Sequence, residues 1–133
     1  MTNNEILQNP RLIVVQKLYS YNINKETELL FPKHRYKKFI KDVVNGTIER
    51  NDLIQDLIDK ELSNDINKNK TELLIKIMLM AAIYEFMFMH KTPVKVVITE
   101  YLKVADHFIE SSQKRFLNAI LDKISKLCRI KDD

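Results

Sequence analysis

Apolar residues recur every three or four positions along most of this chain, and that spacing predicts amphipathic α-helices. The pattern is first seen after Asn9-Pro10, where asparagine is a good N-cap and proline suits the first helical position. The apolar stripe that follows consists of Leu12, Val15, Leu18 and Tyr19, and it is closed by Ile23. We therefore expect a first helix that starts at Pro10 and packs this stripe against a core.

A second apolar pattern begins at Tyr36, after a predicted loop over residues 22–33, and it continues to Leu62. Gly46 lies inside this pattern, and glycine costs about 1 kcal/mol relative to alanine in a helix interior. Two helices with a break near Gly46 are therefore an alternative. We predict one long helix, because the apolar stripe keeps its phase across the glycine.

The polar segment SNDINKNK, residues 63–70, is predicted to be a linker. It divides the chain into an N-terminal helical half, residues 1–62, and a C-terminal helical half, residues 71–133. A length of 133 residues suits a single domain, so we expect both halves to belong to one fold.

The C-terminal half opens with an apolar run from Leu73 to Met89. A membrane span usually needs about 20 apolar residues, and this run is shorter. It also contains Lys76 and Glu85, and each charge near a bilayer centre costs roughly 2.5–3.5 kcal/mol. We therefore predict the central helix of a soluble bundle, apolar on nearly all sides, and no membrane partner.

Two further helices are expected after this run, the first opening at Thr92-Pro93 and the last at Ser111 or Ser112. The chain contains one glycine and three prolines, which leaves few turn residues for a β-sandwich or an α/β fold. The sequence predicts an all-α bundle of two packed subdomains with about six or seven helices.

The composition and the N-terminus indicate a cytoplasmic protein. Cys128 is the single cysteine and cannot form an internal disulfide, which fits a reducing compartment. The opening residues, MTNNEILQNP, do not combine a basic region with an apolar stretch, so no secretory signal is visible.

The formal net charge is +4, and the cationic excess lies in the N-terminal part of the chain. A modest basic bias is compatible with nucleic-acid binding without requiring it. The basic cluster from Lys33 to Lys41 has two interpretations, a solvated helix start or a surface for an anionic partner. The solvated start is the commoner case for such clusters.

The side chains do not form a recognisable catalytic or metal-binding motif. His34, His90 and His107 are not spaced with other ligands in a zinc-like pattern, and neither a glycine-rich phosphate loop nor a serine elbow is present. Glu85 is the most unusual carboxylate, and a buried helix-to-helix anchor explains it better than catalysis does. We expect no enzymatic activity, no metal and no cofactor.

The start of the last helix combines cations with an aromatic ring, in Ser112, Lys114, Arg115 and Phe116. Helix N-termini offer N–H groups to phosphate, cations release counterions, and an exposed ring can stack an unpaired base. The alternative is that Phe116 belongs to the core and the cations are solvated. The spacing alone leaves both interpretations open.

Four segments of the chain, in order, resemble the NusB family of bacterial transcription antitermination factors. The first, RLIVVQKLYSY from Arg11, resembles the family's opening R-x-x-A-x-Q-x-L-Y, and AAIYEF from Ala81 resembles its A-x-Y-E-L helix end. The segment PVKVVITEY from Pro93 resembles P-x-x-V-x-I-N-E-x, and KRFLNAILD from Lys114 resembles K-F-V-N-G-V-L-D.

This resemblance implies an all-helical, non-enzymatic protein of two subdomains, found as a monomer or a homodimer. It implies binding of single-stranded boxA-type RNA together with NusE, which is also a small-subunit ribosomal protein. That pair joins transcribing RNA polymerase in antitermination complexes, notably on ribosomal RNA operons.

The resemblance also implies the residues of two surfaces. The positions that would face RNA are Arg11, Tyr19, Ser112, Lys114, Arg115 and Phe116, on an edge formed by the first helix and the start of the last. The positions that would face the protein partner are Glu85, Lys95 and Glu100.

The chain departs from the family pattern in two places. Familiar members have an arginine-rich segment before the first helix, whereas residues 7–11 here contain one cation, Arg11. Ile109 and Ala119 stand where glycine is common. A protein-only scaffold that binds NusE with weak or lost RNA contact is therefore a second hypothesis. A third, the appendage of an RNA cytosine methyltransferase, is disfavoured because no cofactor-binding region is seen.

Overall fold

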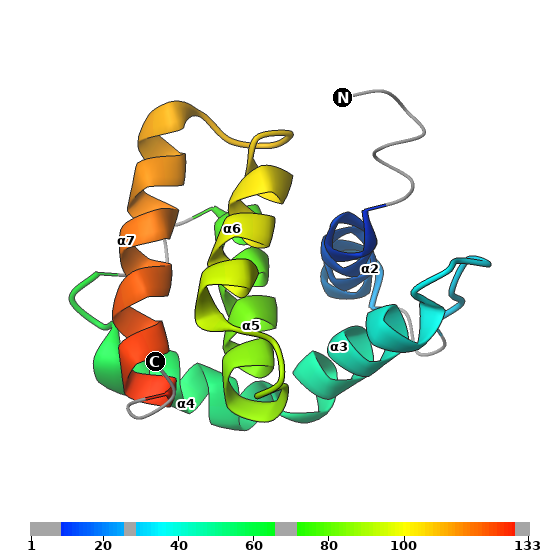
Figure 1. Ribbon diagram of the computed structural model, residues 1–133, viewed down its shortest axis with the longest axis horizontal. Coiled ribbons are helices and arrows are strands. Elements are labelled where there is room, and N and C mark those ends of the chain that lie inside the picture. Colours follow the sequence, from blue (N-terminus) through cyan, green and yellow to red (C-terminus); the bar gives the residue numbers. More distant parts are fainter. Residues whose placement is uncertain (1–8, 26–28, 66–71, 130–133) are drawn as a thin grey trace.

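The computed structural model describes residues 9–25, 29–65 and 72–129, and the regular elements in these ranges are α-helices without a strand (Figure 1). They are α2 (Pro10–Asn24), α3 (Lys37–Glu49), α4 (Asn51–Glu61), α5 (Leu73–Phe88), α6 (Val94–Ala105) and α7 (Ser111–Cys128). The all-α prediction is confirmed. Most of the predicted linker, residues 66–70, lies outside the described residues.

Helix α2 begins where its cap predicts. The Asn9 side chain accepts hydrogen bonds from the backbone N–H groups of Arg11 at 3.0 Å and Leu12 at 3.2 Å. The buried apolar positions are Leu12, Ile13, Val14, Val15 and Leu18. Tyr19 and Ile23, which belong to the predicted stripe, lie on the open side of the helix and are 41% and 55% exposed.

The prediction of one long helix from Tyr36 to Leu62 is wrong. Helix α3 ends at Glu49, Arg50 leaves helical geometry at φ −98° and ψ 17°, and α4 begins at Asn51. The chain changes direction at this point (Figure 1). The apolar stripe keeps its phase across the break because both helices pack against α5.

Gly46 lies within α3 and permits a close approach between α3 and α5. A Cβ atom at this position would lie 2.1 Å from the nearest ring carbon of Tyr84. Any larger residue would therefore force the Tyr84 ring or the α3 backbone to move. The helix breaks four residues later, at Arg50. Gly46 therefore allows α3 to pack closely on α5 and does not cause the bend.

Helix α5 is the centre of the fold and packs against α2, α3, α4, α6 and α7. Its buried residues point in all directions around the axis, from Ile75 to Phe86. This confirms the prediction of a central helix that is apolar on nearly all sides. Within the described ranges, every helix is too short or too polar to traverse a lipid bilayer.

The last two helices start close to the predicted positions. Helix α6 begins at Val94 with Pro93 in the N-cap position, and Thr92 does not provide a side-chain cap. Helix α7 begins at Ser111, as predicted, and Glu110 forms a capping box with Gln113. The Gln113 side-chain oxygen accepts a hydrogen bond from the Glu110 backbone N–H at 3.0 Å.

Candidate nucleic-acid interface

The first turns of α7 present the cationic and aromatic side chains predicted from the sequence. Ser112 and Arg115 are exposed, whereas Lys114 and Phe116 are half-buried. Phe116 packs its inner side against the hydrophobic core and leaves part of its ring open. The Phe116 ring is therefore only partly available to a ligand, because it also packs against the core.

Lys114 already has an anionic neighbour within the chain. Its Nζ lies 2.7 Å from the Asp106 Oδ1, in the turn that joins α6 to α7. Both side chains remain partly exposed to solvent. Exposed ion pairs of this kind contribute about 0–1 kcal/mol, so a phosphate can compete with Asp106 for the lysine.

Helix α2, which carries the exposed Tyr19, is not among the main packing partners of α7 within the described residues. Helix α6 packs against both α2 and α7 and lies between them in Figure 1. The expected edge, in which α2 and the α7 start adjoin directly, is replaced by two patches on either side of α6.

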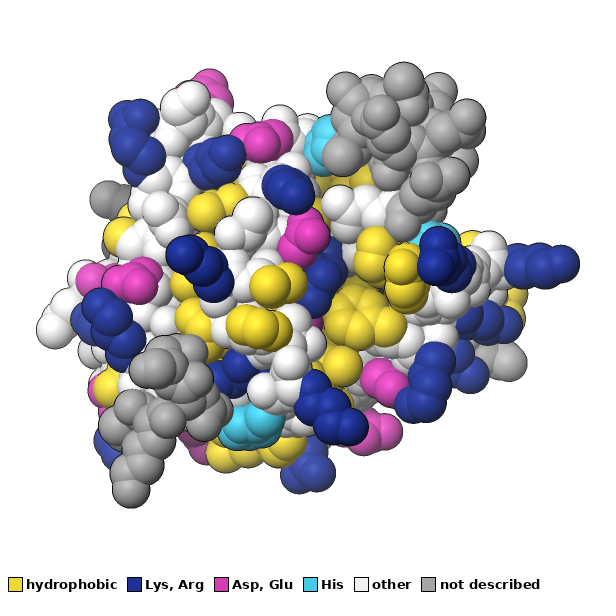
Figure 2. Space-filling view, in the orientation of Figure 1, with side chains coloured by type: hydrophobic (Ala, Val, Ile, Leu, Met, Phe, Trp, Pro, Cys, Tyr) yellow, Lys and Arg dark blue, Asp and Glu magenta, His cyan; other side chains and the backbone are white. Residues whose placement is uncertain are grey.

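The outer face of α6 carries cations of its own. Lys95 and Lys103 are exposed there, and Lys103 Nζ lies 3.6 Å from the half-buried Glu100 carboxylate. Figure 2 shows Lys and Arg side chains distributed over α6 and α7 on this side of the molecule. The path between the two patches is thus partly cationic.

Arg11 and Glu85 form a bidentate ion pair inside the protein. Arg11 Nε donates to Glu85 Oε2 at 3.0 Å, and Arg11 Nη2 donates to Glu85 Oε1 at 2.7 Å. Burial alone would lower the pKa of Arg11, but the hydrogen bond and the charge of Glu85 outweigh it and raise this pKa. The guanidinium also lies 4.8 Å from the centre of the Phe39 ring.

This pair changes the assignment of both residues. Arg11 is 9% exposed and Glu85 is 0% exposed, so neither offers its charge freely to a ligand. The interpretation of Glu85 as a buried anchor between helices is confirmed. A direct partner contact by Glu85 is incompatible with its burial, and Arg11 is better placed to hold α2 against α5 than to reach RNA.

Arg129 is a structural residue that the sequence did not single out. Its guanidinium donates to the backbone carbonyls of Glu85 at 2.9 Å, Phe86 at 2.8 Å and Met89 at 2.8 Å, and also to that of Thr92. A cation is favourable at a helix C-terminus, where carbonyl groups lack helical partners. In the sequence, Arg129 appears only as a cation after the last helix. That position does not indicate that its side chain binds the carbonyl groups at the end of α5.

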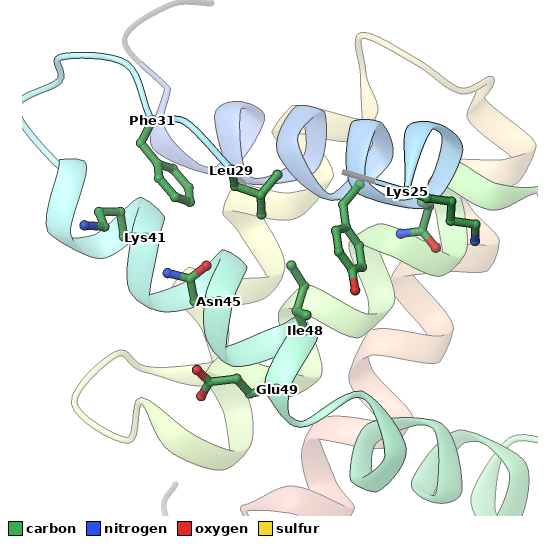
Figure 3. Close-up of a pocket in the computed structure, with 9 residues that line it drawn as sticks. Lys25, Leu29, Phe31, Lys41, Asn45, Ile48 and Glu49 are labelled. Carbon is green, nitrogen blue, oxygen red and sulfur yellow. The ribbon is translucent and has the colours of Figure 1, made fainter. Parts of the chain in front are cut away.

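A groove between α2 and α3 was also missed. We call it the α2–α3 groove, and Figure 3 shows it. Its described lining comes from the end of α2, from Leu29 and Phe31 and from α3, so these residues are scattered over almost thirty sequence positions without a motif. They are Tyr21, Asn22, Lys25, Leu29, Phe31, Lys41, Asn45, Ile48 and Glu49.

Comparisons with known proteins identify the family. A model of the NusB family matches residues 8–126 of the chain. The chain is 35% identical over 86 residues to the transcription antitermination protein NusB of Rickettsia akari, covering 65% of this chain and 55% of that protein.

Two other relatives with the same name match longer stretches. The Rickettsia typhi protein is 29% identical over 122 residues, 92% of this chain and 75% of that protein. The Mesorhizobium japonicum protein is 24% identical over 110 residues, 83% of this chain and 71% of that protein. The chain thus spans between about half and three quarters of these relatives. With the family model matching most of its length, the chain belongs to the NusB family.

Proposed function

We propose that this protein is a non-enzymatic, cytoplasmic transcription antitermination factor that binds single-stranded boxA-type RNA together with NusE. Membership of the NusB family supports the general role, and its similar relatives carry the name transcription antitermination protein. The observation that carries the RNA proposal is the start of α7, where the exposed Arg115 adjoins the partly open Phe116 ring.

The RNA surface of this proposal has two patches. The first consists of Ser112, Lys114, Arg115 and Phe116 on α7, and the second is Tyr19 on α2. Arg115 and Lys114 bind phosphates, while the two rings stack unpaired bases. The single strand crosses α6 between the patches, which places the exposed Lys103 near its backbone.

Arg11 has an indirect role in this proposal. Its guanidinium is engaged by the buried Glu85 carboxylate and therefore fixes the start of α2 on α5. The position of Tyr19, two turns further along α2, depends on that attachment. Arg11 is thus a positioning residue for the ring.

The partner surface is placed on the exposed side of α6, at Lys95 and Glu100. NusE bound there would lie beside the RNA path, since α6 lies between the two RNA patches (Figure 1). Two ligands on adjacent surfaces can each raise the affinity for the other, and such coupling is reciprocal. This complex would join RNA polymerase on ribosomal RNA operons.

An RNA titration tests the proposal. A labelled single-stranded boxA-type RNA is titrated with the wild type and with Arg115→Ala at two salt concentrations. Loss of one phosphate contact should weaken binding and reduce the slope of log K against log salt by about 0.7. Lys126→Ala, an exposed lysine at the other end of α7, is the matched control and should leave both values unchanged.

A protein-only scaffold is the second candidate function. The observation that favours it is the burial of Arg11, since this is the one cation in residues 7–11, where familiar members are rich in arginine. RNA binding that is undetectable at both salt concentrations, with and without NusE, together with retained NusE binding, would select the scaffold and reject the RNA proposal.

A further inference from the structure

The positive charge of this chain is concentrated at the start of α3. Residues 33–42 contain five Lys or Arg and one acidic residue, Asp42. This surplus of four equals the formal net charge of the whole chain, so the charges of the other residues balance. We call the five cations the basic cluster, and they are Lys33, Arg35, Lys37, Lys38 and Lys41. The proposed function does not yet use any of them.

The fold does not need the charges of the basic cluster. All five side chains are exposed, and within the described residues only Lys38 has an acidic partner, the Asp42 carboxylate at 2.8 Å. By contrast, four lysines of α6 and α7 each have an acidic partner, and these are Lys103, Lys114, Lys123 and Lys126. Lys37 and Lys38 also lie in the first turn of α3, where the helix dipole disfavours cations by about 0.3–1 kcal/mol. The charges are therefore available to an external anion.

An exposed aromatic ring lies among these cations. Tyr36 is 47% exposed, and the Arg35 guanidinium lies 5.4 Å from the centre of its ring. The His34 Nδ1 accepts a hydrogen bond from the Tyr36 backbone N–H at 2.9 Å and so fixes the turn that presents the ring. Proteins that bind single-stranded nucleic acid combine cations for the phosphates with rings on which bases stack. An acidic protein segment would need the cations alone, so the ring favours RNA.

The basic cluster lies beside the helix that carries Tyr19. Helices α7, α6, α2 and α3 follow one another across Figure 1, and each neighbouring pair packs together. The Arg11 guanidinium lies 4.8 Å from the centre of the Phe39 ring, so the starts of α2 and α3 are side by side. Figure 2 shows Lys and Arg side chains gathered at the α3 end of this row. The cluster thus extends the row of helices along which the proposed strand runs.

We infer that the basic cluster binds an unpaired RNA segment that flanks the strand held by Arg115 and Tyr19. The cations contact successive phosphates, and the Tyr36 ring stacks one base. The inference rests on the proposed RNA function, because the flanking segment belongs to the same RNA. It adds a contact region whose contribution depends on the length of the RNA.

RNAs of different length test this inference with the whole chain. A single-stranded boxA-type RNA is compared with the same RNA carrying a short oligouridine tail at its 5′ end or at its 3′ end. We expect one of the two tails to tighten binding to the wild type about tenfold at low salt. The gain should shrink as the salt concentration rises, because each phosphate contact adds about 0.7 to the slope of log K against log salt.

A triple variant removes cations of the cluster that lack an acidic partner. Lys33→Ala/Arg35→Ala/Lys37→Ala should bind the tailed and untailed RNAs equally. Its salt slope for the tailed RNA should fall by about 2, at about 0.7 for each lost contact. Because the three side chains are exposed, circular dichroism should match that of the wild type.

Two controls separate the cluster from overall charge and the ring from its hydroxyl. Lys60→Ala/Lys123→Ala/Lys126→Ala removes the same charge from exposed positions on α4 and the far end of α7, and it should keep the gain from the tail. Tyr36→Ala should lose several-fold in affinity for the tailed RNA, since one stacked base is lost. Tyr36→Phe keeps the ring and should bind like the wild type.

The inference is overturned if neither tail tightens binding, or if the triple cluster variant keeps the gain. A polyaspartate peptide that displaces the tail at equal concentration, together with unchanged binding in Tyr36→Ala, would assign the cluster to an acidic protein partner and would overturn it too. Failure of the proposed function is distinguishable, because it appears with the untailed RNA, as binding that Arg115→Ala leaves unchanged. Absence of binding to all three RNAs would reject both.

Discussion

Arg11 at the start of α2 and Glu85 near the end of α5 are joined by two charge-assisted hydrogen bonds, although 74 positions separate them in the sequence. The guanidinium also faces the rings of Phe39 on α3 and Tyr101 on α6. A single buried pair therefore connects four helices. It lies at the point where the N-terminal and C-terminal helices meet.

Removing one member of this pair should destabilise the fold strongly. Arg11→Met leaves the Glu85 carboxylate buried without its partner, and such changes cost about 3–5 kcal/mol. Urea denaturation should report this loss in the free energy of unfolding. The double variant Arg11→Met/Glu85→Met should recover most of it, because no charge remains buried. A single variant as stable as the wild type would contradict the anchor role.

Gly46→Ala should destabilise the protein even though alanine is the better helix former. The new methyl group would meet the Tyr84 ring at 2.1 Å, and overpacking of this kind costs about 1–3 kcal/mol. In a Tyr84→Ala background the same substitution should become neutral or stabilise by up to about 1 kcal/mol, since only helix propensity remains. A double-mutant cycle without coupling would rule out the close approach as the reason for the glycine.

Arg129→Ala should loosen the turn between α5 and α6. Hydrogen bonds to a charged group contribute about 1.5–3 kcal/mol, and several carbonyls lose such a donor at once, so we expect a loss above about 2 kcal/mol. Hydrogen exchange should accelerate for the last turn of α5. Lys126→Ala, an exposed position in the same helix end, should change stability by less than about 0.5 kcal/mol.

Phe116→Ala should weaken RNA binding more than it weakens the fold. Its partly open ring can stack one base, which corresponds to about 1–3 kcal/mol of binding free energy. Leu127→Ala removes another large apolar side chain from α7, one that is 41% exposed, and should leave RNA affinity unchanged. If Phe116→Ala unfolds the chain at ordinary temperature, the ring is a core residue and the α7 patch loses its stacking surface.

Cys128 should react slowly with alkylating reagents. Burial raises the pKa of its thiol from 9.0 to about 11, so the reactive thiolate is about a hundredfold scarcer near neutral pH than for an ordinary cysteine. The alkylation rate should rise until about pH 11. Because the folded pKa is the higher one, this group's contribution to stability is complete below pH 9 and is lost as pH rises through 11. An alkylation rate that levels off near pH 9 would contradict this.

Local sequence signals predicted most helices well. The Asn9 cap and Pro10 predicted the start of α2, and the apolar run from Leu73 predicted the central helix. Each signal depends on neighbours within one or two turns, which a single sequence displays directly. The bend at Arg50 was not predicted, because the helical spacing of the apolar residues continues in phase across it.

The sequence alone determined the helical class, the central position of α5 and the family resemblance, because helical spacing and short motifs are local properties. Only the tertiary structure decided which charges are open to a ligand. It buried Arg11 against Glu85, placed α6 between α2 and α7, and built the α2–α3 groove from separate segments. These features depend on contacts between residues far apart in the chain, and the spacing of neighbouring residues does not specify such contacts.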